Sequence, residues 1–176
     1  MSETFSEGDV LTPAPASSII GNFRRLHAKQ IEDSTIDLLV PGMTDETGGL
    51  YARFRKPSSE SLTAFEKRIE SKEKDRIVVA NADALARNAV GLLWKDADGV
   101  ERSIDPDFED GYVTPFGPRL AMLLDLPWSS SAVALIRAIY GARDEDGQVV
   151  HIDMNVITTA GKLMQWAQGD SDDLGN

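Results

Sequence analysis

The sequence predicts an α+β fold, in which a small N-terminal β-sheet or hairpin is followed by a mostly helical C-terminal half. Two short apolar segments, at residues 36–40 and 50–55, have the length and pattern of strands. An Asp98-Gly99 turn between two further apolar segments predicts a hairpin in the middle of the chain. From residue 132 onwards apolar side chains recur at helical spacing, and the three observations together give the fold class.

The chain of 176 residues has the length of one medium-sized domain with loose ends. Residues 1–33 contain Pro13 and Pro15 and no sustained hydrophobic period, so we predict a flexible N-terminal leader. Residues 34–169 carry the periodic apolar patterns and form the predicted single α+β domain. Residues 170–176 are mainly acidic and predict a flexible tail.

Two strands are expected at the start of the domain. Residues 36–40 are mostly apolar and precede Pro41-Gly42, a pair typical of turns, so we expect the strand to end there. Residues 50–55 alternate between apolar and polar side chains. A glycine-containing turn connects the two segments, which predicts a hairpin or two neighbours in a small sheet.

Two helices are expected next. The Pro-Ser-Ser-Glu sequence at residues 57–60 is a helix-start signal, and Leu62, Phe65 and Ile69 follow at helical spacing. Residues 75–90 are rich in alanine and predict a second helix, although residues 77–79 (Ile-Val-Val) alone would favour a strand.

The middle of the chain is expected to hold a hairpin, a loop and a short helix. Residues 92–95 and 100–104 flank the Asp-Gly turn and are expected to pair. Residues 108–113 are interpreted as an acidic loop. Residues 119–124 predict a short helix that ends before Pro127.

A helix pair in residues 128–169 organises the C-terminal half. Residues 129–131 are serines that can cap a first helix, and Gly141 suits its end. Residues 144–147 (Asp-Glu-Asp-Gly) predict a turn, and Gly169 is expected to end the second helix. The apolar stripe expected on this second helix consists of Ile152, Val156, Ala160, Leu163 and Ala167, flanked by Trp166.

The composition limits the classes of partner. Eighteen Lys and Arg residues stand against 29 Asp and Glu residues, and the net charge of −11 argues against non-specific nucleic-acid binding through phosphate neutralisation and favours a basic partner. No cysteine is present, which excludes disulfides and thiolate metal sites and fits the cytoplasm. No apolar run is long enough to span a membrane, and we expect neither a signal peptide nor membrane association.

The sequence predicts neither an enzyme nor a metal or cofactor site. Two Asp-Gly segments resemble calcium loops, but the first ligand position would fall on Trp94 or on Ala142, which offer no side-chain oxygen. His27 and His151 have no second histidine nearby and are interpreted as surface or cap residues. The phosphate-binding, dinucleotide-binding and serine-hydrolase motifs are absent from the sequence. One carboxylate group, which could hold a cation or serve as an acid/base pair but is interpreted as a solvated acidic loop, comprises Asp105, Asp107, Glu109 and Asp110.

The order of several short segments resembles the tail assembly chaperones of long-tailed bacteriophages, particularly those of actinobacterial hosts. The segments are ANADAL at residues 80–85, LLWKDADG at 92–99, RLAMLLDLP at 119–127, LIRAIYG at 135–141 and LMQWAQG at 163–169. The acidic end, DSDDLGN, is similar to that of the shorter product that such genes encode. The resemblance covers residues 34–176.

The resemblance implies a protein without catalytic residues. It implies binding of the tape measure protein in the host cytoplasm, recruitment of tail tube subunits and absence from the mature virion. An alternative is a structural tail or neck component that stays in the virion, and a homo-oligomer is left open. The residues expected to contact the partner, unless they prove to be internal, are Leu135, Ile139, Leu163, Met164 and Trp166.

Genes of this family commonly carry a backward ribosomal slip near the end of the short product. Codons for residues 174–176 (Leu-Gly-Asn) can spell the slippery heptamer G-GGA-AAC. The resemblance therefore implies a longer frameshifted form that shares this chain as its N-terminal part. A disordered solubilising end is the alternative reading of the same residues.

Overall fold

The computed structural model describes residues 19, 21–23, 25–26, 34–127 and 131–169. The chain divides into two compact units, Met1–Ser34 and Thr35–Asn176. In the first unit the described residues 19, 21–23 and 25–26 are helical. The predicted flexible leader lies mostly outside the described residues and the predicted acidic tail lies entirely outside them, so both stay predictions.

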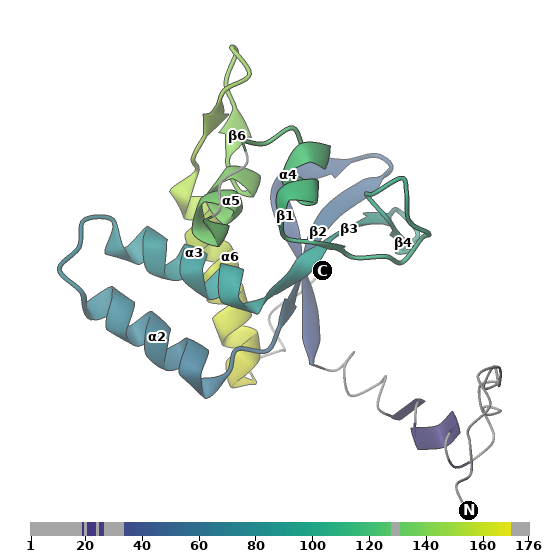
Figure 1. Ribbon diagram of the computed structural model, residues 1–176, viewed down its shortest axis with the longest axis horizontal. Coiled ribbons are helices and arrows are strands. Elements are labelled where there is room, and N and C mark those ends of the chain that lie inside the picture. The colour runs from purple at the N-terminus through teal and green to yellow at the C-terminus, as the bar shows by residue number, and fades with distance from the viewer. Residues whose placement is uncertain (1–18, 20, 24, 27–33, 128–130, 170–176) are drawn as a thin grey trace, which may run out of the picture. The chain divides into compact units, whose positions relative to one another are not determined.

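The second unit has the predicted α+β architecture, with an antiparallel sheet and helices (Figure 1). The sheet runs in the order β1-β2-β3-β4, and β5 also pairs with β3. Its strands are β1 (Thr35–Asp45), β2 (Gly48–Arg55), β3 (Ala89–Asp96), β4 (Glu101–Arg102) and β5 (Thr114–Pro115). The two N-terminal strands and the Asp-Gly hairpin, which appears as β3 and β4, are therefore confirmed.

The predicted end of the first strand was wrong. Strand β1 continues through Pro41-Gly42 to Asp45, and its register against β2 shifts between Leu39 and Thr44. A shift of this kind accommodates Pro41, which has no N–H for the ladder, and Gly42, whose φ of 78° suits glycine. The irregular segment interrupts the pairing without ending the strand.

One face of the sheet forms the core. Leu50, Ala52 and Phe54 alternate along β2 and are buried, as period-two patterning requires. Across the ladder Ala52 pairs with Leu92, which is fully buried, and Leu50 pairs with Trp94. Trp94 is partly buried against this cluster.

The other face carries an ion-pair network. The Asp37 carboxylate accepts two hydrogen bonds of 2.7 Å from Arg53, which is its cross-strand neighbour, and lies 2.8 Å from Lys95 Nζ. Arg53 also donates to Glu101 at 2.5 Å. Burial raises the pKa of Asp37, but the hydrogen bonds from Arg53 and Lys95 outweigh it and hold that pKa below its usual value.

Helix α3 (Arg76–Asn88) lies beside α2 (Ser59–Glu70), α5 (Ala132–Ile139) and α6 (Asp153–Gln168). Its first turn contains Ile77-Val78-Val79, so the helical prediction for this segment is confirmed over its local strand preference. Asn88 is buried at the end of α3 and donates to Ser61 Oγ at 3.0 Å and to the Ala84 carbonyl at 2.7 Å. The predicted N-cap of α2 is also present, because Ser58 accepts from the Ser61 N–H at 3.2 Å.

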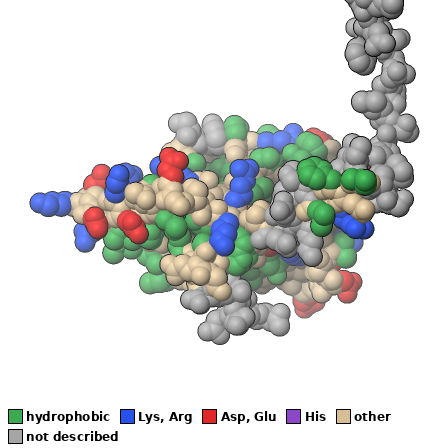
Figure 2. All heavy atoms as spheres, turned by 90° about the horizontal axis from the view of Figure 1, so that it is seen from below, with side chains coloured by type: hydrophobic (Ala, Val, Ile, Leu, Met, Phe, Trp, Pro, Cys, Tyr) green, Lys and Arg blue, Asp and Glu red, His purple; other side chains and the backbone are tan. Residues whose placement is uncertain are grey.

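The end of the second unit formed by the connection between α2 and α3 is strongly charged. Figure 2 shows Lys, Arg, Asp and Glu side chains gathered there, while apolar side chains reach the surface in the middle of the same face. The connection, residues 71–75, includes both Lys72 and Glu73, so the two signs of charge alternate. Mixed charge of this kind keeps the helix ends solvated.

The described part of the C-terminal half contains the three expected helices. It also contains a hairpin, which the sequence did not predict. The helices are α4 (Pro118–Leu123), α5 (Ala132–Ile139) and α6 (Asp153–Gln168). Between α5 and α6, the expected acidic turn is the tip of a two-stranded sheet made of β6 (Ala142–Arg143) and β7 (Val149–Val150). Asp144 Oδ1 stabilises this tip by accepting from the N–H groups of Asp146 and Gln148.

The apolar stripe of α6 is largely as predicted. Val156, Ala160 and Leu163 are buried, and Gly169 ends the helix at a φ of 93°. Ile152 was predicted to share this stripe but precedes the helix and is 37% exposed. His151, which we interpreted as a surface or cap residue, is likewise exposed and precedes the helix. Ser131 of the predicted serine cap accepts from the Ala134 N–H at 3.3 Å.

The interpretation of Asp105 as part of a solvated acidic loop was wrong. Its carboxylate is inaccessible to solvent. Arg119 from α4 donates to both of its oxygens and to Asp107 Oδ2, so one guanidinium fastens the loop to the helix. Hydrogen bonding from Arg119 holds the pKa of Asp105 below its usual value.

We predict that Asp105 makes folding stability depend on pH. Because its pKa is lower in the folded chain than in the unfolded one, its contribution is present above the ordinary carboxyl pKa and is lost as the pH falls through the lowered value. Asp105→Asn should melt at a lower temperature than the parent at neutral pH, and the difference should shrink toward about pH 3. Asp98→Asn, in the exposed hairpin turn, is the matched control, and equal pH profiles for parent and Asp105→Asn would contradict the assignment.

Leu163→Asp should collapse the C-terminal helix packing. It places an unpaired charge at a position with no solvent exposure, and we expect a loss of more than about 3 kcal/mol in the free energy of unfolding. Met154→Asp on the same helix, at a side chain that is 67% exposed, should change it by less than about 0.5 kcal/mol. Urea denaturation measures both, and similar midpoints for the two variants would place Leu163 at the surface.

Candidate partner-binding groove

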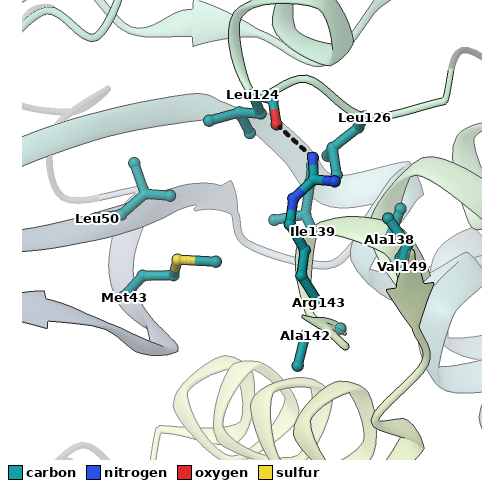
Figure 3. A pocket seen from close by; sticks show the side chains of 10 residues that line it. Met43, Leu50, Leu124, Leu126, Ala138, Ile139, Ala142, Arg143 and Val149 are labelled. Carbon is teal, nitrogen blue, oxygen red and sulfur yellow. Dashed lines mark hydrogen bonds between the residues drawn. The ribbon is translucent and has the colours of Figure 1, made fainter. Parts of the chain in front are cut away.

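Two adjoining hollows form a groove beside the irregular segment of β1, and we call it the Met43 groove. The smaller hollow has a volume of about 250 Å³ and is lined by Met43, Leu50, Leu124, Leu126, Ala138, Ile139, Gly141, Ala142, Arg143 and Val149 (Figure 3). The larger has a volume of about 570 Å³ and is lined by Pro41, Gly42, Met43, Gly141, Ala142, Arg143, Ile152 and Asn155. Met43 and the segment 141–143 belong to both hollows, which makes the groove continuous.

The groove is positioned by two deviations from regular structure. The register shift in β1 carries Met43 out of the regular ladder and leaves it 42% exposed. On the other side, Gly141 allows close contact with β7, because a Cβ at this position would lie 2.5 Å from the Val150 carbonyl oxygen. We expected Gly141 only at the end of a helix, and the structure adds a packing reason for glycine there.

Apolar side chains form the floor of the groove. Ile139 is 3% exposed and contributes the inner wall from α5, and Leu50 contributes from β2. Met43 and Ile152, by contrast, reach the solvent at the rim. Methionine can repack around differently shaped partners at low cost, so the rim can adapt to an apolar side chain that enters.

The Arg143 side chain points its guanidinium toward Leu124 (Figure 3). Its guanidinium donates to the Gly147 carbonyl at 2.7 Å, to the Leu124 carbonyl at 3.3 Å and to the Asp125 carbonyl. The Asp125 carboxylate lies 3.6 Å from the same guanidinium. These contacts connect the β6–β7 hairpin to the segment after α4 and offset the charge of Arg143.

Carboxylates flank the lining residues. Asp125 lies between Leu124 and Leu126, and its side chain is 99% exposed. Residues 144–146, Asp-Glu-Asp, follow Arg143 at the hairpin tip and are exposed as well. Among the lining residues, Arg143 is charged and most of the others are apolar. The groove therefore has an apolar interior, and the exposed carboxylates lie outside it.

The residues that the sequence suggested as partner contacts fall into two groups. Leu135, Ile139 and Leu163 are at most 3% exposed, so they belong to the core and only Ile139 reaches the groove, as part of its lining. They were correctly identified as apolar helix positions, and Leu135 and Leu163 are internal, which is the alternative that we left open for them. Met164 and Trp166 are half-buried, and Trp166 packs against the core cluster.

The sequence did not identify Met43, Ala142 and Arg143 as site residues. Two signals were present: Pro41-Gly42 inside an apolar stretch, and Val149-Val150 directly after an acidic turn. The first indicates an irregular strand and the second a hairpin, but neither shows that the two lie side by side.

The remaining candidate chemistry does not converge on one place. Within the part of the chain that the structure describes, no group of three or more His, Cys, Asp or Glu side chains could hold a metal ion. Asp105 and Asp107 are both held by Arg119, and His27 lies outside the described residues. His151 Nδ1 lies 3.2 Å from the Arg137 carbonyl oxygen at the end of α5.

Comparisons with protein families, with curated proteins and with solved structures find no match to this chain. In the described ranges, no helix combines the length and the apolar character needed to cross a membrane.

Arg143→Met should loosen the β6–β7 hairpin while leaving the remaining fold intact. The variant loses the charge-assisted hydrogen bonds to residues 124, 125 and 147, and their partial exposure reduces the effect. We expect amide hydrogen exchange in residues 141–150 to become faster by roughly tenfold. Arg68→Met, which removes only a 3.9 Å surface ion pair with Glu73, should leave exchange there unchanged, and equal rates in all three proteins would contradict this role.

Proposed function

We propose that this chain is a non-enzymatic tail assembly chaperone of a long-tailed bacteriophage. In this proposal it binds the tape measure protein in the host cytoplasm, keeps it soluble and helps to recruit tail tube subunits. It leaves before the virion is complete. The resemblance of residues 34–176 to such chaperones is the starting point, and the surface of the second unit gives physical support.

The Met43 groove is the observation that carries the proposal. A chaperone for a long apolar partner needs an accessible apolar surface that tolerates different side chains. The groove offers buried apolar walls, two open hollows and an exposed Met43 at the rim. A binding surface of this kind needs no catalytic group.

The charge of the chain supports the proposal that it keeps the tape measure protein soluble. A net charge of −11 makes a complex repel other copies of itself, which opposes aggregation of an apolar client. Much of this charge lies on exposed positions such as Asp125 and residues 144–146. Acidic surface beside apolar walls lets one small protein cover its partner and hold it in solution.

The same surface could serve a structural tail or neck component. Such a component would persist in purified virions, whereas a chaperone would be absent, so mass spectrometry of particles separates the two functions. A longer frameshifted form is also part of the proposal. An immunoblot of infected cells with antibody against residues before Gly169 should then show two bands.

We predict that co-expression with the tape measure protein raises the soluble fraction of that protein and yields a complex on gel filtration. Met43→Asp should remove most of this gain, because the charge would enter the shared wall of both hollows. Met122→Asp is the matched control, since Met122 is 66% exposed on α4 and does not line the groove. Unchanged solubility together with the absence of a complex would remove the main support for the chaperone function.

A further inference from the structure

We infer that the segment bound by the Met43 groove is cationic, with a bulky apolar side chain that enters the smaller hollow and Lys or Arg side chains next to it in the sequence. This inference rests on the proposed function and specifies the chemistry of its partner. The occupant is a stretch of protein chain rather than a small molecule or a nucleic acid.

The lining of the smaller hollow favours an apolar side chain. The volume of this hollow is about 250 Å³. Its walls come from aliphatic residues such as Leu124, Leu126 and Ile139, which provide no polar groups to orient a cofactor. One or two apolar side chains fill such a space, and the larger hollow can then hold the neighbouring part of the same segment.

Arg143 does not call for an anionic partner. Three backbone carbonyls accept from its guanidinium, and the Asp125 carboxylate lies 3.6 Å away. These contacts already use the Arg143 guanidinium to hold the hairpin, and an acidic ligand would compete with the Asp125 carboxylate for its charge.

The carboxylates of the hairpin tip are available to a cation. Glu145 and Asp146 are exposed there, two and three positions after Arg143 of the lining. The Asp125 carboxylate, by contrast, already lies 3.6 Å from the Arg143 guanidinium. Exposed carboxylates beside an apolar hollow attract Lys and Arg next to an apolar residue and repel acidic segments.

The test uses the full chain and a fluorescein-labelled synthetic helical peptide of Leu and Lys residues, with binding measured by fluorescence anisotropy. Two comparison peptides replace every Lys with Glu or every Leu with Ala. We expect the Leu/Lys peptide to bind at least about tenfold more tightly than either comparison peptide. Its affinity should fall as added salt screens the carboxylates.

Two pairs of variants assign the binding to the groove. Ala142→Trp fills the groove from an exposed position, and Ala97→Trp makes the same change at the exposed tip of the β3–β4 hairpin. Glu145→Lys with Asp146→Lys reverses the charge at the hairpin tip. Glu66→Lys with Glu70→Lys changes the net charge of the chain by the same amount, but on α2. Only the first variant of each pair should weaken binding of the Leu/Lys peptide, by about tenfold.

Equal weakening by Glu66→Lys with Glu70→Lys would show a general charge effect and overturn the inference. Equal binding of the Glu peptide would do the same. A chain that solubilises the tape measure protein but does not bind the Leu/Lys peptide would overturn the inference alone. A chain that binds this peptide at the groove without solubilising the tape measure protein would support the inference and overturn the proposed function.

Discussion

The packing of α3 is the constraint on which the second unit depends. The helix contacts α2, α5, α6 and β2, so most of the fold is assembled around it. It can serve so many neighbours because Ala80, Ala82 and Ala84 are buried and small, which allows the surrounding backbones to approach closely, while Val78 and Leu85 fill the spaces between them. A large side chain at any of the three alanines would separate elements that are far apart in the sequence, so the shape of the Met43 groove depends indirectly on this helix through α5.

The parts of the fold that could be predicted are those set by local pattern. Alternation identified β2, the Asp-Gly turn identified the hairpin of β3 and β4, and spacing identified the buried positions of α6. The irregular continuation of β1 could not be predicted, because Pro41-Gly42 ends many strands and only pairing with β2 carries this one onward. Asp105 was misjudged for the same reason: its partner, Arg119, is fourteen positions away in the sequence.

The candidate site was harder to predict than the fold. Helical periodicity finds apolar faces but does not say whether a face meets the core or a partner, and Leu135 and Leu163 meet the core. The groove instead arises where an irregular strand lies beside a short hairpin, and both are minor features of the sequence. An interaction surface made from departures from regularity leaves little periodic signal, whereas a core made from regular elements leaves a strong one.

The contact between Gly141 and Val150 has a consequence for how this surface could change over time. At that point the spacing is fixed by main-chain atoms, since no side chain fits between residue 141 and the opposite carbonyl. The neighbouring positions 43 and 142 carry exposed side chains and are free of that restriction. Substitutions at Met43 and Ala142 could therefore adapt the groove to a partner whose sequence changes, while the backbone of the groove keeps its dimensions. Recognition and architecture could then evolve separately.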